Sequence, residues 1–272
     1  MTKIQTYVTG IILVSTCFSA SADQLAEVQA RGTLVCGVLG TFEPFGYTDP
    51  GSRNVVGYDV DMCIALAKAI GVKAEVKPVS VEARIPELQQ GHMDVLVAGL
   101  GYSAARAEQV DYSKGYYISE HKLMVKSAKS FSAPSDLAGK RVSFTKGGIT
   151  EAFVRGAVPA AQLTGYEDTT TAFTALVQNK VAGFSAPEVV EKRLISKMEG
   201  KSSDFQVLEP AVGQEYWGIG VRKNEGALLA AVNKGLDELE NNGEAQKVFE
   251  TWLGAGTVYN LKRPFNIAPI PR

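Results

Sequence analysis

Short apolar runs alternate with helical patterns along most of the chain. Residues 34–38 are typical of a buried strand, and residues 61–70 place their apolar side chains on one helical face. A strand at 74–79, a short helix at 84–90 and a further buried strand at 93–98 follow. This alternation predicts an α/β fold, with a parallel sheet that is covered by helices on both faces.

The second half of the chain continues the same alternation. The elements predicted there are strands at 122–125, 141–144 and 181–185, and helices at 150–155, 170–179, 228–239 and 244–253. With 272 residues, the chain is long enough for one large domain or for two modest ones.

The amino-terminal residues have the order of a secretory signal peptide. Lys3 is the only charged residue among the first 22, residues 7–18 are mostly apolar, and Ala20-Ser21-Ala22 offers the small residues that signal peptidase recognises. The apolar part is too short to remain in a bilayer. We therefore expect residues 1–22 to be removed as a signal peptide, which leaves a soluble, exported product.

Charge and side-chain chemistry argue against several classes of partner. The chain has 28 Lys and Arg against 29 Asp and Glu, a net charge of −1, which argues against binding to nucleic acid or to an anionic membrane. It has only two histidines and three cysteines, without the close spacing of a zinc site. We expect neither a metal nor a cofactor.

Two cysteines remain after the signal peptide, Cys36 in the first predicted strand and Cys63 in the helix that follows. An exported protein can form disulfides, so the two could pair. The interpretation that we favour is free cysteine, because buried free cysteine packs as a small apolar residue. The sequence alone leaves the pairing open.

The motif that says most about function begins at Gly57. Residues 57–62, Gly-Tyr-Asp-Val-Asp-Met, lead into Ile-Ala-Leu-Ala at 64–67 and resemble the signature of family 3 bacterial extracellular solute-binding proteins. Members of this family are periplasmic receptors of polar amino-acid ABC importers. Further blocks resemble the family in the same order along the chain, at 43–45, 84–88, 94–97, 103–106, 110–113, 136–142 and 217–223.

The resemblance implies the type II periplasmic binding protein fold, in which two α/β lobes are joined by two hinge strands and close over a ligand in the cleft between them. It places lobe 1 at residues 23–117 and 213–272, and lobe 2 at residues 118–212. The partners that it implies are a small carboxylate ligand, such as a polar amino acid or a derivative, and an inner-membrane ABC permease. We expect a periplasmic monomer.

Arg106 is the strongest candidate for a ligand contact. Its guanidinium offers parallel donors that match a carboxylate. Ser103 would cap the short helix that carries it, and without the resemblance a capped surface arginine would be the simpler interpretation. The resemblance implies that Arg106, helped by the hydroxyl of Ser103, binds the α-carboxylate of the ligand.

A second anion-binding signal lies at Gly147-Gly148, before the helix predicted to begin at Thr150. Exposed N–H groups at a helix start can bind a carboxylate, and glycine allows close approach. By resemblance, Gly148, Ile149 and Thr150 belong to the clamp of lobe 2. Arg106 and this loop would then hold one anion from both sides, which gives the ligand a reason to favour closure.

Three residues would decide which ligand fits. By resemblance Phe42 lies against the ligand side chain, although a core phenylalanine is an equally good interpretation. Arg84 matches an arginine that binds a side-chain carboxylate in receptors for acidic amino acids and that also occurs in receptors for other ligands. Leu39 stands where receptors for basic amino acids have an aspartate, which argues against a lysine or arginine ligand, since a buried ammonium would lack a partner.

Several positions depart from the family pattern. The family's aspartate for the ligand α-ammonium is replaced by Ala-Pro-Glu at 186–188, where Glu188 is the nearest acid. Gly99 and Gly101 stand where hydroxyl residues are common, and Ile149 stands where a threonine often helps to hold the carboxylate. The ammonium anchor is thus lost or rebuilt, and the ligand could be an amino acid, an opine-like derivative or another small carboxylate.

Two functions on this scaffold are compatible with the sequence. We expect a receptor without enzymatic activity, whose role in transport or in signalling the sequence does not separate. The alternative is an exported enzyme that resembles cyclohexadienyl dehydratase, with Glu188 as the general acid. His92 and His121 have no evident nucleophile or ligand cluster nearby, so we expect neither to be catalytic.

Overall fold

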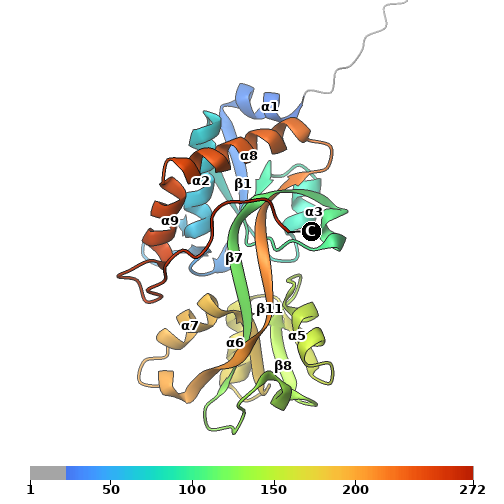
Figure 1. The fold of residues 1–272 in the computed structure, drawn as a ribbon, viewed down its shortest axis with the longest axis vertical. Coiled ribbons are helices and arrows are strands. Elements are labelled where there is room, and N and C mark those ends of the chain that lie inside the picture. Colours follow the sequence, from blue (N-terminus) through green and yellow to red (C-terminus); the bar gives the residue numbers. More distant parts are fainter. Residues whose placement is uncertain (1–22, 272) are drawn as a thin grey trace, which may run out of the picture.

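The computed structural model describes residues 23–271, which form two lobes connected by two long strands, β7 (Val110–Lys126) and β11 (Phe205–Arg222) (Figure 1). The predicted two-lobed α/β architecture is confirmed. The signal peptide predicted over residues 1–22 lies outside the described residues. In the part of the chain that the structure describes, no helix is long and apolar enough to span a membrane.

One eight-stranded sheet runs through both lobes, in the order β5-β1-β6-β11-β7-β10-β8-β9. Its lobe 1 strands are β5 (Lys73–Val79), β1 (Thr33–Leu39) and β6 (Val95–Leu96). Its lobe 2 strands are β10 (Gly183–Pro187), β8 (Arg141–Thr145) and β9 (Gln162–Tyr166). A second sheet in lobe 1 consists of the short strands β2 (Thr41–Phe42), β3 (Gly46–Thr48) and β4 (Val55–Val56).

The strands predicted at 34–38, 74–79 and 93–98 pair in parallel as expected, while the large sheet as a whole is mixed. β1 pairs in parallel with β5 and β6, and β8 pairs in parallel with β9 and β10. The hinge strands β7 and β11 pair antiparallel with each other and with their neighbours. The reason is that the chain enters lobe 2 along β7 and returns along β11. The predicted lobe boundaries, at 118 and 213, fall within these two strands and stay a prediction.

Lobe 1 contains six helices: α1 (Gln24–Arg31), α2 (Tyr58–Ile70), α3 (Arg84–Gln89), α4 (Ala104–Ala107), α8 (Gly226–Asn241) and α9 (Glu244–Leu253). α2 packs against α8 and α9 (Figure 1). The α2–α8 contact requires a glycine at 235, because a Cβ there would lie 2.7 Å from Leu66 Cδ1. The predicted helix at 61–70 is confirmed, with an earlier start at Tyr58 and an end at Gly71, whose φ is 88°.

Lobe 2 contains α5 (Thr150–Ala157), α6 (Thr169–Val177) and α7 (Glu188–Ser196), together with 3₁₀ helices at Pro134–Leu137 and Ser202–Asp204. The predicted strands at 141–144 and 181–185 and the predicted helices at 150–155 and 170–179 are confirmed within a few residues. The sequence patterns do not predict α1, α7 or β9. These three elements bury few side chains, so they carry few of the apolar residues on which the sequence patterns depend.

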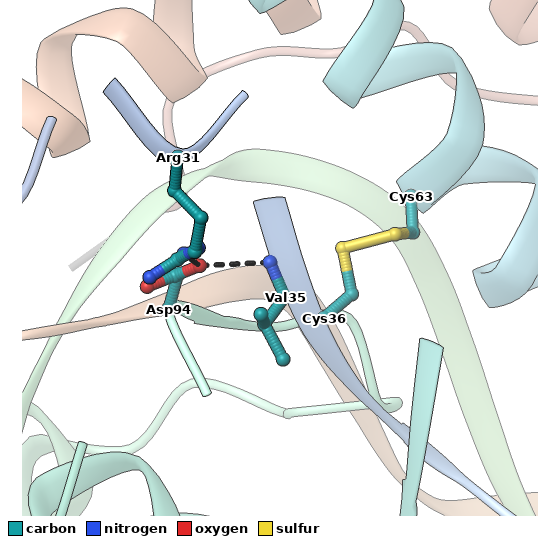
Figure 2. Close-up of a disulfide and its surroundings, with 5 residues drawn as sticks. All are labelled: Arg31, Val35, Cys36, Cys63 and Asp94. Atoms are coloured by element: carbon teal, nitrogen blue, oxygen red, sulfur yellow. Dashed lines mark hydrogen bonds and ion pairs between the residues drawn. A yellow bond between two sulfur atoms is a disulfide. The ribbon is translucent and has the colours of Figure 1, made fainter. Parts of the chain in front are cut away.

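A disulfide joins Cys36 of β1 to Cys63 of α2, with a sequence separation of 27 (Figure 2). The structure thus decides a pairing that the sequence leaves open, and the free cysteines that we favoured are not found. Close by, Asp94 accepts a hydrogen bond from the backbone N of Val35 at 2.7 Å and forms an ion pair with Arg31 of α1. β1 is therefore fixed to α2 by a covalent bond and to α1 through a carboxylate.

The carboxyl-terminal segment, residues 254–271, returns across the hinge strands (Figure 1). Ala268 forms an antiparallel bridge with Gly115 of β7. The guanidinium of Arg263 donates two hydrogen bonds to the carboxylate of Glu240 in α8, at 3.0 and 2.6 Å. These contacts hold the segment on lobe 1.

Candidate functional site

A cavity of about 40 Å³ lies between the lobes, beside the hinge strands. Most of the residues predicted to bind the ligand line it, namely Phe42, Arg84, Gly99, Arg106, Gly148, Ile149 and Thr150. The rest of its wall is formed by Leu39, Val81, His121, Thr145, Thr169, Ser185, Ala186, Pro187 and Glu215. The predicted residues Gly101, Ser103 and Glu188 do not line it.

Arg84, at the start of α3, is buried in the lobe 1 wall. Its guanidinium donates hydrogen bonds to four carbonyl oxygens, those of Val81 (3.0 Å), Ala98 (2.7 Å), Gly99 (3.0 Å) and, in lobe 2, Gly147 (3.3 Å). Burial and then repulsion by Arg106 lower the pKa of Arg84 to about 10, so it remains charged at neutral pH. Since carbonyls already occupy most of its donors, Arg84 holds the cleft wall in place and supplies positive charge.

Arg106 reaches the cavity from α4. The predicted cap is present, because Ser103 Oγ accepts a hydrogen bond from the backbone N of Arg106 at 3.3 Å. The guanidinium donates to Gly101 O at 2.9 Å and, across the cleft, to Gly147 O at 2.7 Å. A guanidinium has five N–H donors, so Arg106 keeps several that can bind a carboxylate.

The turn before α5 forms the facing wall in lobe 2. Gly147 has a φ of 72°, in the left-handed region that glycine tolerates, and its carbonyl accepts hydrogen bonds from both arginines. Gly148, Ile149 and Thr150 line the cavity at the start of α5, where backbone N–H groups have no intrahelical partner. This wall therefore offers donors to an anion and one carbonyl acceptor to the arginines.

The hinge strands add a buried chain of hydrogen bonds that the sequence analysis missed. Oε1 of Glu215 in β11 accepts from His121 Nε2 of β7 and from Trp217 Nε1, both at 2.7 Å. His121 Nδ1 lies 3.0 Å from Thr150 Oγ1. His121, for which the sequence indicated no nucleophile or ligand cluster, thus has two polar side-chain partners in space, and that it is not catalytic stays a prediction. These residues meet only because β7 and β11 pair, and nothing in their sequence spacing indicates the contact.

The carboxylate of Glu215 is ionised in this setting. Burial opposes its ionisation, but His121, Trp217 and Arg106 outweigh that effect and hold the pKa of Glu215 below its ordinary value. The cavity wall thus combines two guanidinium cations with one carboxylate, and it can bind a solute that carries both signs of charge.

Two side chains give the cavity an apolar side. Phe42 packs against Phe45 and Trp217, with ring centroids 5.3 and 5.9 Å away, and also lines the cavity. Phe42 is therefore at once a core residue and a part of the cavity wall. Leu39 is buried on the same side and brings no charge to it.

Glu188, the first residue of α7, lies outside the cavity wall. It forms ion pairs with Lys122 at 3.3 Å and with Lys192 at 2.8 Å. Burial opposes its ionisation, but Lys192 and Lys122 outweigh that effect and lower the pKa of Glu188. Because it does not line the cavity and is paired with two lysines, of which Lys122 also pairs with Glu209, Glu188 is not placed to bind a ligand ammonium there.

The lobes also touch at the mouth of the cleft. Glu43 of lobe 1 accepts a hydrogen bond from Arg193 Nε of α7 at 2.6 Å and forms an ion pair with Lys197. Together with the contact between Arg106 and Gly147, these interactions describe a closed arrangement of the lobes. Among residues 23–271, no three His, Cys, Asp or Glu side chains gather in a way that could hold a metal ion.

Known proteins resemble this chain over most of its length. Residues 34–255 match the model of the family described as bacterial extracellular solute-binding proteins, family 3. The ABC transporter glutamine-binding protein GlnH of Bacillus subtilis is 27% identical over 90% of this chain and 93% of that protein. The L-cystine-binding protein TcyJ of Escherichia coli K12 is 28% identical over 85% of this chain and 86% of that protein.

A solved structure shares both sequence and fold with this chain. It is the ancestral amino acid-binding protein AncCDT-1, described as a precursor of cyclohexadienyl dehydratase. The two structures superpose with a TM-score of 0.76, and their sequences are 27% identical. The match covers 85% of this chain and 99% of the AncCDT-1 chain.

Proposed function

Because the chain belongs to the bacterial extracellular solute-binding proteins of family 3, we propose that it is the periplasmic receptor of an ABC importer. It binds a small carboxylate, a polar amino acid or a derivative of one, between its lobes and releases it unchanged to an inner-membrane permease. Residues 1–22 direct its export as a signal peptide, and the monomer is the active form. The names of the glutamine- and cystine-binding relatives support this class of ligand.

The observation that carries the proposal is the position of Arg106. Its half-buried guanidinium lies in a cavity between two lobes, opposite the backbone N–H groups at the start of α5. A carboxylate placed between them would accept charge-assisted hydrogen bonds from both lobes at once. Such a ligand stabilises the closed arrangement more than the open one, which is the requirement for ligand-driven closure.

Calorimetric titration tests the proposal. The purified protein is unfolded and refolded to remove any solute that it retained, and it is then titrated with the standard amino acids and with small organic acids. At least one should bind with a Kd near 1 μM, which corresponds to about −8 kcal/mol. Arg106→Ala should abolish that binding. Failure of every solute to bind, or unchanged binding by the variant, would contradict the proposal.

An enzyme on the same scaffold is the second candidate, and two observations favour considering it. One is the likeness to AncCDT-1, and the other is the hydrogen-bonded chain from Thr150 through His121 to Glu215, whose imidazole and carboxylate could exchange protons. Incubation with prephenate or arogenate, followed by detection of product, separates the two functions. We expect no turnover. Turnover by the wild type that is lost in His121→Asn would show that the protein is an enzyme and not a receptor.

A further inference from the structure

We propose that Glu215 of the hinge strand β11 is the anchor for a protonated amine of the ligand, and that the receptor therefore selects amine-bearing carboxylates over plain organic acids. The inference rests on the proposed function, because it assumes that a small carboxylate binds beside Arg106. It assigns the ammonium anchor to a hinge strand, whereas the family pattern places it after a strand of lobe 2.

The hydrogen bonds of Glu215 leave one of its oxygens available. Oε1 accepts from both His121 Nε2 and Trp217 Nε1. No hydrogen-bond donor among the described residues bonds to Oε2. Oε2 is nevertheless not fully enclosed, because it is not one of the fully buried polar atoms that lack a hydrogen-bond partner. The side chain lines the cavity, so Oε2 is an acceptor that a ligand can reach. An ionised carboxylate oxygen of a largely buried side chain favours a cationic donor such as an ammonium.

Gly101 explains how this carboxylate fits. A Cβ at position 101 would lie 1.6 Å from Glu215 Oε2, so any side chain there would displace the carboxylate. The glycine, which in sequence is only a departure from the pattern, therefore makes room for a carboxylate from the neighbouring strand. Gly101 and Glu215 therefore fit together, since the carboxylate occupies the space that a side chain at position 101 would fill.

The anchor and the arginine are adjacent, as an α-amino acid requires. The carbonyl of Gly101 accepts a hydrogen bond from Arg106 Nη1 at 2.9 Å, while Glu215 Oε2 occupies the space where a Cβ of the same residue would lie. A carboxylate and an ammonium on one carbon atom could thus meet Arg106 and Glu215 together. The other candidate acid, Glu188, is balanced by two lysines, and no further Asp or Glu lines the cavity.

Paired probes that differ only in the amine test this inference. The pairs are L-glutamine with glutaramate and L-cystine with dithiodipropionate, each titrated into the wild-type protein by calorimetry. The amino acids of at least one pair should bind at least about 30-fold more tightly than the deaminated partner, which is the effect expected of one desolvated charge pair. Glu215→Gln should remove that preference while Arg106 remains in place.

A second variant keeps the inference testable if Glu215→Gln fails to fold without its contacts to His121 and Trp217. Gly101→Ala retains every polar group but forces Oε2 aside, and it should reduce the preference for the amine at least about 10-fold. The matched controls are Glu120→Gln, an exposed acid on β7, and Gly156→Ala, where a Cβ meets nothing within 4 Å. Both should bind as the wild type does.

The outcomes separate the anchor from the proposed function. If the deaminated acids bind as tightly as the amino acids, and Glu215→Gln changes neither, the anchor is overturned while the carboxylate receptor stands. If neither member of any pair binds, nor any other carboxylate, both proposals are overturned. Loss of amine preference in Glu215→Gln and in Gly101→Ala, with both controls unchanged, supports the anchor.

Discussion

The two lobes present different chemistry to the cleft and are stabilised differently. Lobe 1 brings the charged side chains of Arg84 and Arg106, and it contains the disulfide. Lobe 2 faces the cleft with backbone groups and with hydroxyls such as those of Thr150 and Ser185. By sequence it contains no cysteine.

This difference indicates a division of work between the lobes. Two neighbouring cations repel each other and lose hydration on burial, so the wall that holds them needs a rigid support. N–H and hydroxyl groups lose less hydration energy on burial than cations do, and in the cavity wall itself the lobe that bears them separates no ion pair when it moves. We infer that lobe 1 is the fixed half that first attracts the anion, and that lobe 2 completes the site on closing.

Removing the disulfide should show this asymmetry most strongly. Replacing Cys36 and Cys63 by Ala should lower the free energy of unfolding by about 3.5 kcal/mol, because the cross-link closes a loop across a separation of 27 residues. Urea denaturation measures the total effect, and hydrogen exchange resolves it by lobe. Protection should fall in α2 and β1 and stay unchanged in α5 and α6. An equal loss of protection in both lobes would contradict the idea of a separately stabilised lobe 1.

Each lobe contains a fully buried carboxyl whose pKa burial raises, Asp59 in lobe 1 and Glu191 in lobe 2, and Asp59 should make the stability of lobe 1 depend on pH. Burial raises the pKa of Asp59 to about 8, although Tyr116 donates a hydrogen bond to Oδ1 at 2.9 Å. In the unfolded chain this carboxyl ionises near pH 4. The folded protein keeps the proton, so the stabilising effect is fully present below that pH and is lost as pH rises toward 8.

The expected slope is a fall in the free energy of unfolding of up to about 1.4 kcal/mol per pH unit between pH 5 and 7. Urea denaturation of the wild type and of Asp59→Asn at both pH values measures it. The asparagine variant should have a flatter pH dependence, and Asp168→Asn, a partly exposed helix cap in lobe 2, is the matched control. Identical slopes in the wild type and Asp59→Asn would show that the carboxyl is ionised in the folded state.

A comparison of one residue from each cleft wall tests where binding depends on charge. Arg84→Gln should lower the free energy of unfolding by about 2 kcal/mol, because it leaves several buried carbonyls without their charged donor. Thr150→Val removes one hydrogen bond to His121 and should cost about 1 kcal/mol. Calorimetry should also show the larger loss of affinity for Arg84→Gln. A larger loss for Thr150→Val would reverse the proposed order of the lobes.

The contact at the cleft mouth should have the smallest effect. Glu43→Gln weakens the ion pairs to Arg193 and Lys197, which are partly exposed. Such pairs contribute about 0.5 kcal/mol, so the affinity should fall about two-fold through a less stable closed arrangement. Glu151→Gln, which breaks an exposed pair with Arg155 within α5, should leave the affinity unchanged. An affinity loss above ten-fold for Glu43→Gln would mean that the mouth contributes as much as the cavity.

The elements with strong periodicity were predictable from sequence. α2 buries a continuous face and ends at a glycine in the left-handed conformation, and β1 is buried along most of its length, so local patterns fix both. α7 and β9 bury few side chains, and the register of β7 against β11 includes shifts near Gly213 and Gly218. Long-range pairing sets such registers, and no local pattern contains them.

The candidate site divides in the same way. Arg106, Ser103 and the loop at 147–150 lie within short motifs, so sequence could place the helix cap and the guanidinium together. Glu188 was predicted to bind the ligand because it lies close in sequence to the position of the family's aspartate. The sequence does not show that Lys122 and Lys192 pair with it in space. Glu215 was missed because its neighbours come from β7, α4 and α5, far away in sequence.

The sequence by itself determined the alternation of strands and helices, the family and the arginine aimed at an anion, because each depends on residues close together along the chain. Only the tertiary structure decided that Cys36 and Cys63 are bonded, that Arg84 is held by carbonyls from both lobes and that the space beside Gly101 holds a carboxylate. These features depend on which strands pair and how closely two lobes approach. Hydrophobic burial and backbone hydrogen bonding determine the pairing of the strands and the approach of the lobes. Both act between residues that lie far apart in the sequence.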